Sequence, residues 1–156
     1  MKNILIGILA MSLLMITSCK KKDTVSGGSW SFKSKSYTVT SAITNTADNA
    51  FVVISSGNNT YNQLFFSFTT LPSADGSYTV VAGAPDSTGT QVGVALTLTT
   101  GSTYVSTAYA PTTNTTANVT VANGIMKVTV PATDFANVAD GTDHADLTAT
   151  VNQTEK

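Results

Sequence analysis

The chain has 156 residues, of which 42% are hydrophobic and 11% are charged, and its formal net charge is −1. This length accommodates one ordinary domain. All eight basic residues are lysines. A near-neutral chain without arginine lacks both the electrostatic attraction and the bidentate donors that favour nucleic acid, so we expect no nucleic-acid partner.

Residues 1–18 have the layout of a secretion signal. Lys2 supplies a positive start, and the apolar run 4–16 is shorter than the roughly 20 residues that a membrane-spanning helix needs. The sequence Ile-Thr-Ser-Cys at 16–19 resembles the bacterial lipobox, whose cysteine receives diacylglycerol before cleavage. This resemblance implies that Cys19 is lipidated and becomes the first residue of the mature protein. Cys19 is also the only cysteine, so no disulfide can form within the chain.

Residues 19–29 are polar and rich in lysine, glycine and serine, which predicts a flexible tether between the lipid anchor and the domain. In lipoproteins of double-membrane bacteria, an aspartate after the lipidated cysteine retains some members in the inner membrane. Lys20 stands at that position here. The resemblance therefore implies the outer membrane of a Gram-negative bacterium, and it leaves open whether the domain faces the periplasm or the cell surface.

Residues 30–156 are expected to form a single β domain, because hydrophobic residues alternate with polar ones and turn residues recur at short intervals. The continuous apolar run 51–54 is typical of a central strand. The segment 63–68 places Leu64, Phe66 and Phe68 on one face.

The second half of the domain carries the strongest local pattern. Residues 91–99 alternate strictly between apolar and small or polar side chains. Asn123-Gly124, between two alternating runs, predicts a type I′ hairpin turn over 117–130. Counting outward from this turn pairs Val121 with Met126 and Val119 with Val128 on one face, with polar residues on the other.

About eight to ten short strands and no helix after the leader favour an antiparallel β-sandwich. The alternative is a lipocalin-like β-barrel. Gly28-Ser29-Trp30 resembles the Gly-x-Trp of the first lipocalin strand, which would imply a barrel that holds a small ligand. The arginine that lipocalins pack against this tryptophan is absent from the chain.

A wider resemblance covers most of the chain. Its motifs are Cys-Lys-Lys-Lys-Asp at 19–23, Gly-Ser-Trp-Ser-Phe-Lys-Ser-Lys-Ser-Tyr-Thr-Val at 28–39, Asp-Gly-Ser-Tyr-Thr-Val-Val at 75–81, Val-Ala-Asn-Gly-Ile-Met-Lys-Val at 121–128 and Leu-Thr-Ala-Thr-Val at 147–151. Together they are similar to small uncharacterised lipoproteins of Gram-negative bacteria. The resemblance implies a secreted, lipid-anchored β domain and carries over no functional site.

The residues that could perform catalysis are few. The chain has one histidine, His144, and one glutamate, Glu155, near its end, and no known catalytic or phosphate-binding motif occurs. Asp140, Asp143 and Asp146 form the only acidic cluster. Their spacing differs from that of an EF-hand loop, so we interpret the cluster as a turn and treat it as a weak calcium candidate. We expect no metal, no cofactor and no enzymatic activity.

Tyr61, Tyr104 and Tyr109 are weak candidates for ligand binding, because a tyrosine beside polar residues can stack on a sugar ring. The alternative is that each caps the edge of the sandwich with its hydroxyl in water. The leading functional hypothesis is a lipid-anchored envelope protein with a non-catalytic binding or structural role, with a glycan or a partner protein as the ligand. The alternatives are a small-ligand carrier built on a barrel and an aspartate-dependent hydrolase.

Overall fold

The computed structural model describes residues 27–57, 60–100 and 105–153. Within these ranges every regular element is a strand, so the predicted all-β fold is confirmed. The strands are β1 (Gly28–Phe32), β2 (Lys35–Thr38), β3 (Ser41–Asn45), β4 (Ala50–Gly57), β5 (Thr60–Phe68), β6 (Gly76–Val81), β7 (Gln91–Thr100), β8 (Val105–Pro111), β9 (Thr116–Ala122), β10 (Ile125–Asn137) and β11 (His144–Asn152). The described part thus has one strand more than the upper end of the expected number.

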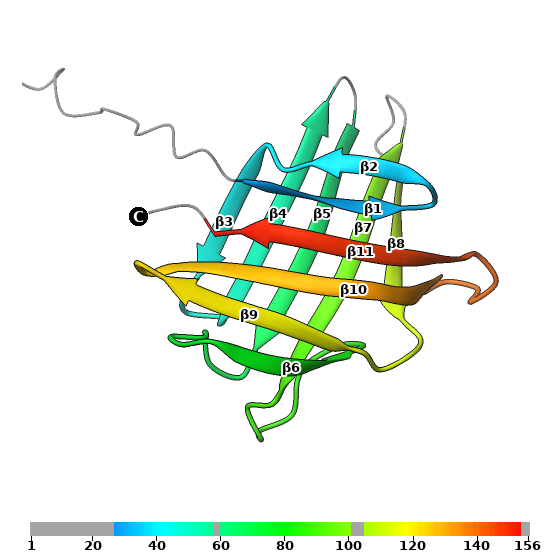
Figure 1. The fold of residues 1–156 in the computed structure, drawn as a ribbon. Coiled ribbons are helices and arrows are strands. Elements are labelled where there is room, and N and C mark those ends of the chain that lie inside the picture. The colour runs from blue at the N-terminus through cyan, green and yellow to red at the C-terminus, as the bar shows by residue number, and fades with distance from the viewer. Residues whose placement is uncertain (1–26, 58–59, 101–104, 154–156) are drawn as a thin grey trace, which may run out of the picture.

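The strands lie in two layers that cross steeply (Figure 1). The front layer has the order β2-β1-β11-β10-β9-β6, and the back layer has the order β3-β4-β5-β7-β8. The first strand of the domain therefore lies beside the last one, with Gly28 opposite Val151.

Hydrogen bonding continues from one layer to the other. β6 pairs with β7 in parallel, which the sequence analysis did not expect, and β8 pairs with both β7 and β10. Between β2 and β3, Val39 N donates to Gly28 O of β1, whereas Thr40 N donates to Ile54 O of β4. The two layers face each other as in a sandwich, but strand pairing continues between them as in a barrel. The strand pairing therefore does not decide between the two expected architectures.

The space between the layers is filled by large apolar side chains from both. The fully buried aromatic residues are Trp30, Phe32, Phe51, Phe66 and Phe135. Four of these rings pack in pairs, two of them against buried tyrosines: the ring centroids lie 5.5 Å apart for Trp30 and Tyr37, 4.8 Å for Phe32 and Tyr109, and 5.7 Å for Phe51 and Phe66. Burial of each phenylalanine contributes about 1.5–3 kcal/mol to folding, so these rings, together with the buried aliphatic residues around them, hold the layers together.

The hairpin predicted around Asn123-Gly124 is confirmed. Asn123 has φ 53° and Gly124 has φ 77°, as a type I′ turn requires. The observed pairs include Val121 with Met126 and Val119 with Val128, in the predicted register. The inward members of these pairs are buried or half-buried, whereas Thr120 and Lys127 on the other face are exposed.

β10 extends much further than the predicted hairpin, because it continues through Pro131 to Asn137. Its register with β11 shifts between Val130 and Thr133, so Pro131 lies in a bulge, where its missing N–H costs no ladder hydrogen bond. Beyond the bulge, β10 also pairs with β8, with Phe135 opposite Pro111. The bulge thus marks the point from which one strand pairs with both layers.

The start of the domain also differs from the prediction. β1 begins at Gly28, inside the segment expected to be a tether. Gly28 has φ 115°, and a Cβ there would lie 2.8 Å from Val151 Cα and would clash with the Thr150 carbonyl oxygen. Close approach of the last strand therefore requires glycine at this position.

We predict that Gly124→Val lowers the free energy of unfolding by about 1–3 kcal/mol, because a β-branched residue is strained at positive φ. No atom lies within 4 Å of a Cβ built at Gly124, so the loss reports backbone conformation and not a clash. Urea unfolding measures the change. Gly124→Asn is the matched control, since asparagine tolerates this region, and equal midpoints for the wild type and Gly124→Val would contradict the predicted strain.

Candidate functional site

The outer face of the front layer carries one continuous row of polar side chains, which we name the polar row. It consists of Thr38, Ser29, Thr150, Thr129, Asn118 and Ser77, one from each strand in spatial order. Each member is directly opposite the next in the strand register, and all are exposed or half-buried. Because neighbouring strands lie roughly 4.8 Å apart, the row spans about 24 Å.

A shallow hollow of about 220 Å³ lies beside the polar row. The hydroxyl residues that line it are Ser29, Ser31, Ser36, Thr148 and Thr150. Pro131, exposed in the β10 bulge, contributes an apolar ring to the same lining. Hydroxyl groups both donate and accept hydrogen bonds, so the hollow offers neutral polar contacts next to a small apolar surface.

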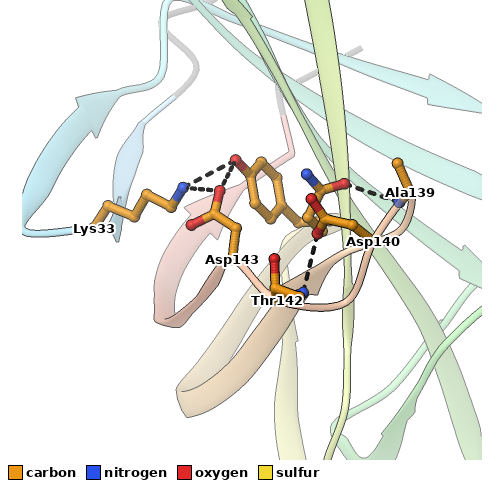
Figure 2. Close-up of polar contacts among 7 residues, drawn as sticks. Lys33, Ala139, Asp140, Thr142 and Asp143 are labelled. Carbon is orange, nitrogen blue, oxygen red and sulfur yellow. Dashed lines mark hydrogen bonds and ion pairs between the residues drawn. The ribbon is translucent and has the colours of Figure 1, made fainter.

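A second polar cluster lies where the β1–β2 turn meets the β10–β11 connection (Figure 2). Lys33 Nζ forms an ion pair with Asp143 and donates to the Tyr109 hydroxyl at 3.0 Å, and that hydroxyl donates to Asp143 Oδ2 at 2.8 Å. The Lys33 ammonium also lies 4.8 Å from the centroid of the Tyr109 ring. These contacts join three segments that are distant in the sequence.

Lys33 and Ser34 form the two-residue turn of the β1–β2 hairpin, in which Phe32 pairs with Lys35. Their φ values are 52° and 59°, a region that disfavours residues other than glycine, asparagine and aspartate. Such strain persists only where the surrounding contacts require it. The contacts of the Lys33 side chain with Tyr109 and Asp143 hold the turn in this conformation.

The charges of the Lys33 cluster are suited to holding segments together and not to transferring protons near neutral pH. The hydrogen bonds from Lys33 and Tyr109 lower the pKa of Asp143. Burial by itself would lower the pKa of Lys33, but the hydrogen bonds with Asp143 and Tyr109 outweigh it and raise that pKa. Both pKa values therefore move away from neutrality, opposite to the tuning that general acid–base catalysis favours.

His144 belongs to a neighbouring pair in the same region. Its Nδ1 lies 3.1 Å from Asp134 Oδ2, and its Nε2 lies 2.5 Å from the Gly141 carbonyl oxygen. Both partners are acceptors, so the ring binds them best as a doubly protonated imidazolium. The hydrogen bonds to Asp134 and Gly141 accordingly raise the pKa of His144. The only hydroxyl bonded to Asp134 among the described contacts is that of Thr112, and none is bonded to His144.

The three aspartates considered for calcium do not converge. Asp143 is paired with Lys33, and Asp140 Oδ1 accepts a hydrogen bond from Thr142 N at 3.0 Å within its own turn (Figure 2). Asp146 lies in β11 opposite Asp134. Among residues 27–57, 60–100 and 105–153, no three acidic, histidine or cysteine side chains are grouped to hold a metal ion. The local turn that the sequence analysis favoured is present at Asp140.

The candidate tyrosines have different environments. Tyr61 is 41% exposed on the outer side of β5. Tyr109 is only 4% exposed, so little of its ring is available to a ligand on the surface. Its ring packs against Phe32 in the interior while its hydroxyl reaches Lys33, an arrangement that alternation within β8 could not reveal. Tyr104 and Cys19 lie outside the described residues.

Sequence reasoning missed both the polar row as a unit and the role of Lys33. The alternating serine and threonine residues indicated polar strand faces, but the row depends on pairings such as Ser29 with Thr150, which local sequence does not specify. For Lys33 the available signal was weak, because a Lys-Ser turn lacks the glycine or asparagine that usually marks a two-residue hairpin.

Comparison of the chain with protein-family models, with curated proteins and with solved structures found no match in any of the three. In the part of the chain that the structure describes, no helix is both long enough and apolar enough to cross a membrane.

We predict that the His144–Asp134 pair stabilises the fold more at mildly acidic than at alkaline pH. The pKa of His144 is raised above its ordinary 6.5, so its contribution is complete below that value and is lost as the pH rises through the folded-state pKa. The urea midpoint should therefore fall between about pH 5.5 and pH 8.5. The fall should be smaller in His144→Gln. An equal fall in both proteins would contradict a raised pKa.

Proposed function

We propose that the protein is a lipid-anchored component of the outer membrane of a Gram-negative bacterium that binds glycan without catalysis. The single observation that carries the binding role is the polar row with its adjoining hollow. The anchoring role rests on the sequence of the leader and on Cys19.

Glycan chemistry fits the front face. A sugar presents several hydroxyl groups and one apolar ring face, and the hollow combines hydroxyl residues with the exposed ring of Pro131. The polar row adds one neutral hydrogen-bonding side chain per strand beyond the hollow. A shallow face of this kind buries few contacts, so the affinity should be low, with a dissociation constant of about 10⁻⁴ M or weaker.

The state of the titratable residues supports a non-catalytic role. The pKa values of Asp134 and Asp143 are both lowered, the first mainly by the hydrogen bond from Thr112 and the second mainly by that from Lys33. Both ring nitrogens of His144 are already hydrogen-bonded. A hydrolase requires a base that is free to accept a proton, and these groups do not supply one.

The packing of the interior supports a surface site over the alternative of a ligand carried within a barrel. The space between the layers is occupied by fully buried side chains, including Trp30, Phe51 and Phe66. A carrier needs an internal volume that its ligand can fill.

We predict that the double substitution Thr129→Val/Thr150→Val weakens glycan binding at least about fivefold, because it removes two central hydroxyl groups of the polar row while keeping side-chain shape and β propensity. A glycan array that includes neutral and acidic bacterial polysaccharide fragments identifies the ligand, and calorimetric titration measures its affinity. Thr97→Val, on β7 of the back layer, is the matched control and should bind normally. Failure of the wild type to bind any glycan, or equal binding by all three proteins, would refute the proposal.

We also predict that Cys19→Ala abolishes lipid attachment in a Gram-negative host. The variant should lose incorporated acyl label and move from the membrane to the soluble fraction, because the apolar leader is too short to act as a membrane-spanning helix. Serine in place of Cys19 provides a near-isosteric control that should behave like alanine. Retained label or full membrane recovery of either variant would exclude this anchor.

A further inference from the structure

The outer face of the back layer carries an apolar row across four adjacent strands. Ile43, Val52, Phe65 and Ala95 lie directly opposite one another in the strand register. Ile43 is 53% exposed and Phe65 is 37% exposed, and neither belongs to the core cluster between the layers. Tyr61 lies on the same side of β5, four residues from Phe65, and is also exposed.

The strands of the back layer carry no charged residue. None of the strands β3, β4, β5, β7 and β8 contains an aspartate, glutamate, lysine, arginine or histidine. On the same face the apolar row is flanked by the neutral polar residues Ser41, Gln63 and Thr97, with the buried Ile54 between Ser41 and Gln63 in the register. By contrast, β2, β10 and β11 of the front layer carry Lys35, Lys127 and Asp146.

The pattern matches the composition of a protein–protein interface. Charged residues are depleted from the centre of interfaces, whereas tyrosine and phenylalanine are enriched there. Charges on exposed sheet surfaces also prevent unwanted association, and the back layer lacks this protection. An exposed aromatic and aliphatic row on strands without charged residues therefore indicates a surface that is covered by a protein.

We propose that the back layer is covered by the back layer of a second copy of this chain, in a two-fold symmetric dimer. Strands without charged residues offer no charge that a different partner could complement. An apolar row that packs against the same row of a second copy is buried in both copies by the same contacts. The row crosses the strands of a sheet, and two such sheets can pack face to face about 10 Å apart.

The size of the face agrees with a dimer of moderate strength. Five strands at a spacing of about 4.8 Å and a length of about 20 Å give roughly 500 Å² per copy. Two copies would bury about 1,000 Å², close to the lower limit for a specific interface. Back-to-back packing leaves the polar row of each copy on the outside, so the dimer is compatible with glycan binding but does not depend on it.

Photocrosslinking of the full chain in intact cells tests the proposal. A benzoylphenylalanine residue replaces Tyr61 on the back layer, and the same probe replaces the exposed Thr148 on the front layer as the control. Two differently tagged copies are expressed together, so that a band of twice the monomer mass carrying both tags identifies a homodimer. We expect this band from the Tyr61 probe and at most a trace of it from the Thr148 probe.

Charge introduced into the apolar row should prevent association. Ile43→Lys should reduce the homodimer band from the Tyr61 probe roughly tenfold, because each copy would place an unpaired charge in the apolar contact. Thr120→Lys places the same charge on an exposed residue of β9 in the front layer and should leave the band within about twofold of its original yield. Thermal unfolding of both variants checks that they fold, and Phe65→Gln serves as a second disrupting variant.

Four outcomes would overturn the dimer. The first is that the Tyr61 probe gives no homodimer band, and the second is that it gives an adduct with a different protein. The third is that the Thr148 probe gives an equal homodimer band. The fourth is that the band from the Tyr61 probe survives both Ile43→Lys and Phe65→Gln. If the wild type gives the homodimer band but binds no glycan, the proposed function is contradicted and the dimer is not.

Discussion

The arrangement of this domain depends on β10, the strand that pairs with both layers. Up to Val130 it lies between β9 and β11, and after the bulge at Pro131 it also reaches β8. One continuous strand thus holds the two layers at a fixed separation at this corner. A fixed separation allows the aromatic side chains between the layers to pack closely. The same bulge exposes Pro131 beside the hydroxyl residues of the hollow. One of the features that join the layers thus also shapes the candidate binding surface.

Much of the fold follows from local sequence patterns. Alternation identified the strands of the second half, and Asn123-Gly124 specified both a turn and a register, because few residues adopt positive φ twice in succession. Local patterns failed where a long-range contact outweighs local preference. Pro131 normally interrupts a strand, yet β10 continues through it because the bulge removes the need for its hydrogen bond. The parallel β6–β7 pair likewise has no local signal.

The candidate surfaces were less accessible to sequence reasoning than the fold. Serine and threonine at alternate positions indicated a polar face, but only the pairing of strands that are distant in the sequence turns them into a single row. Tyr109 shows the converse difficulty: the same residue supplies a buried ring and a bonded hydroxyl, and the alternation of β8 cannot separate these roles. The result is a molecule with two unlike outer faces, one of hydrogen-bonding groups and one with an apolar centre.

The pairing of β1 with β11 determines when the domain can fold. Gly28 and Val151 are neighbours in the sheet although almost the whole domain separates them in the chain, and contacts of this kind form slowly because a long loop must close first. During synthesis, β1 has only the short β2 to pair with until the last strand has left the ribosome. A chain that cannot complete its sheet before its C-terminus emerges stays open for longer. Such a delay is compatible with the proposed export of the chain, in which the unfolded chain would cross a membrane and complete its sheet on the far side.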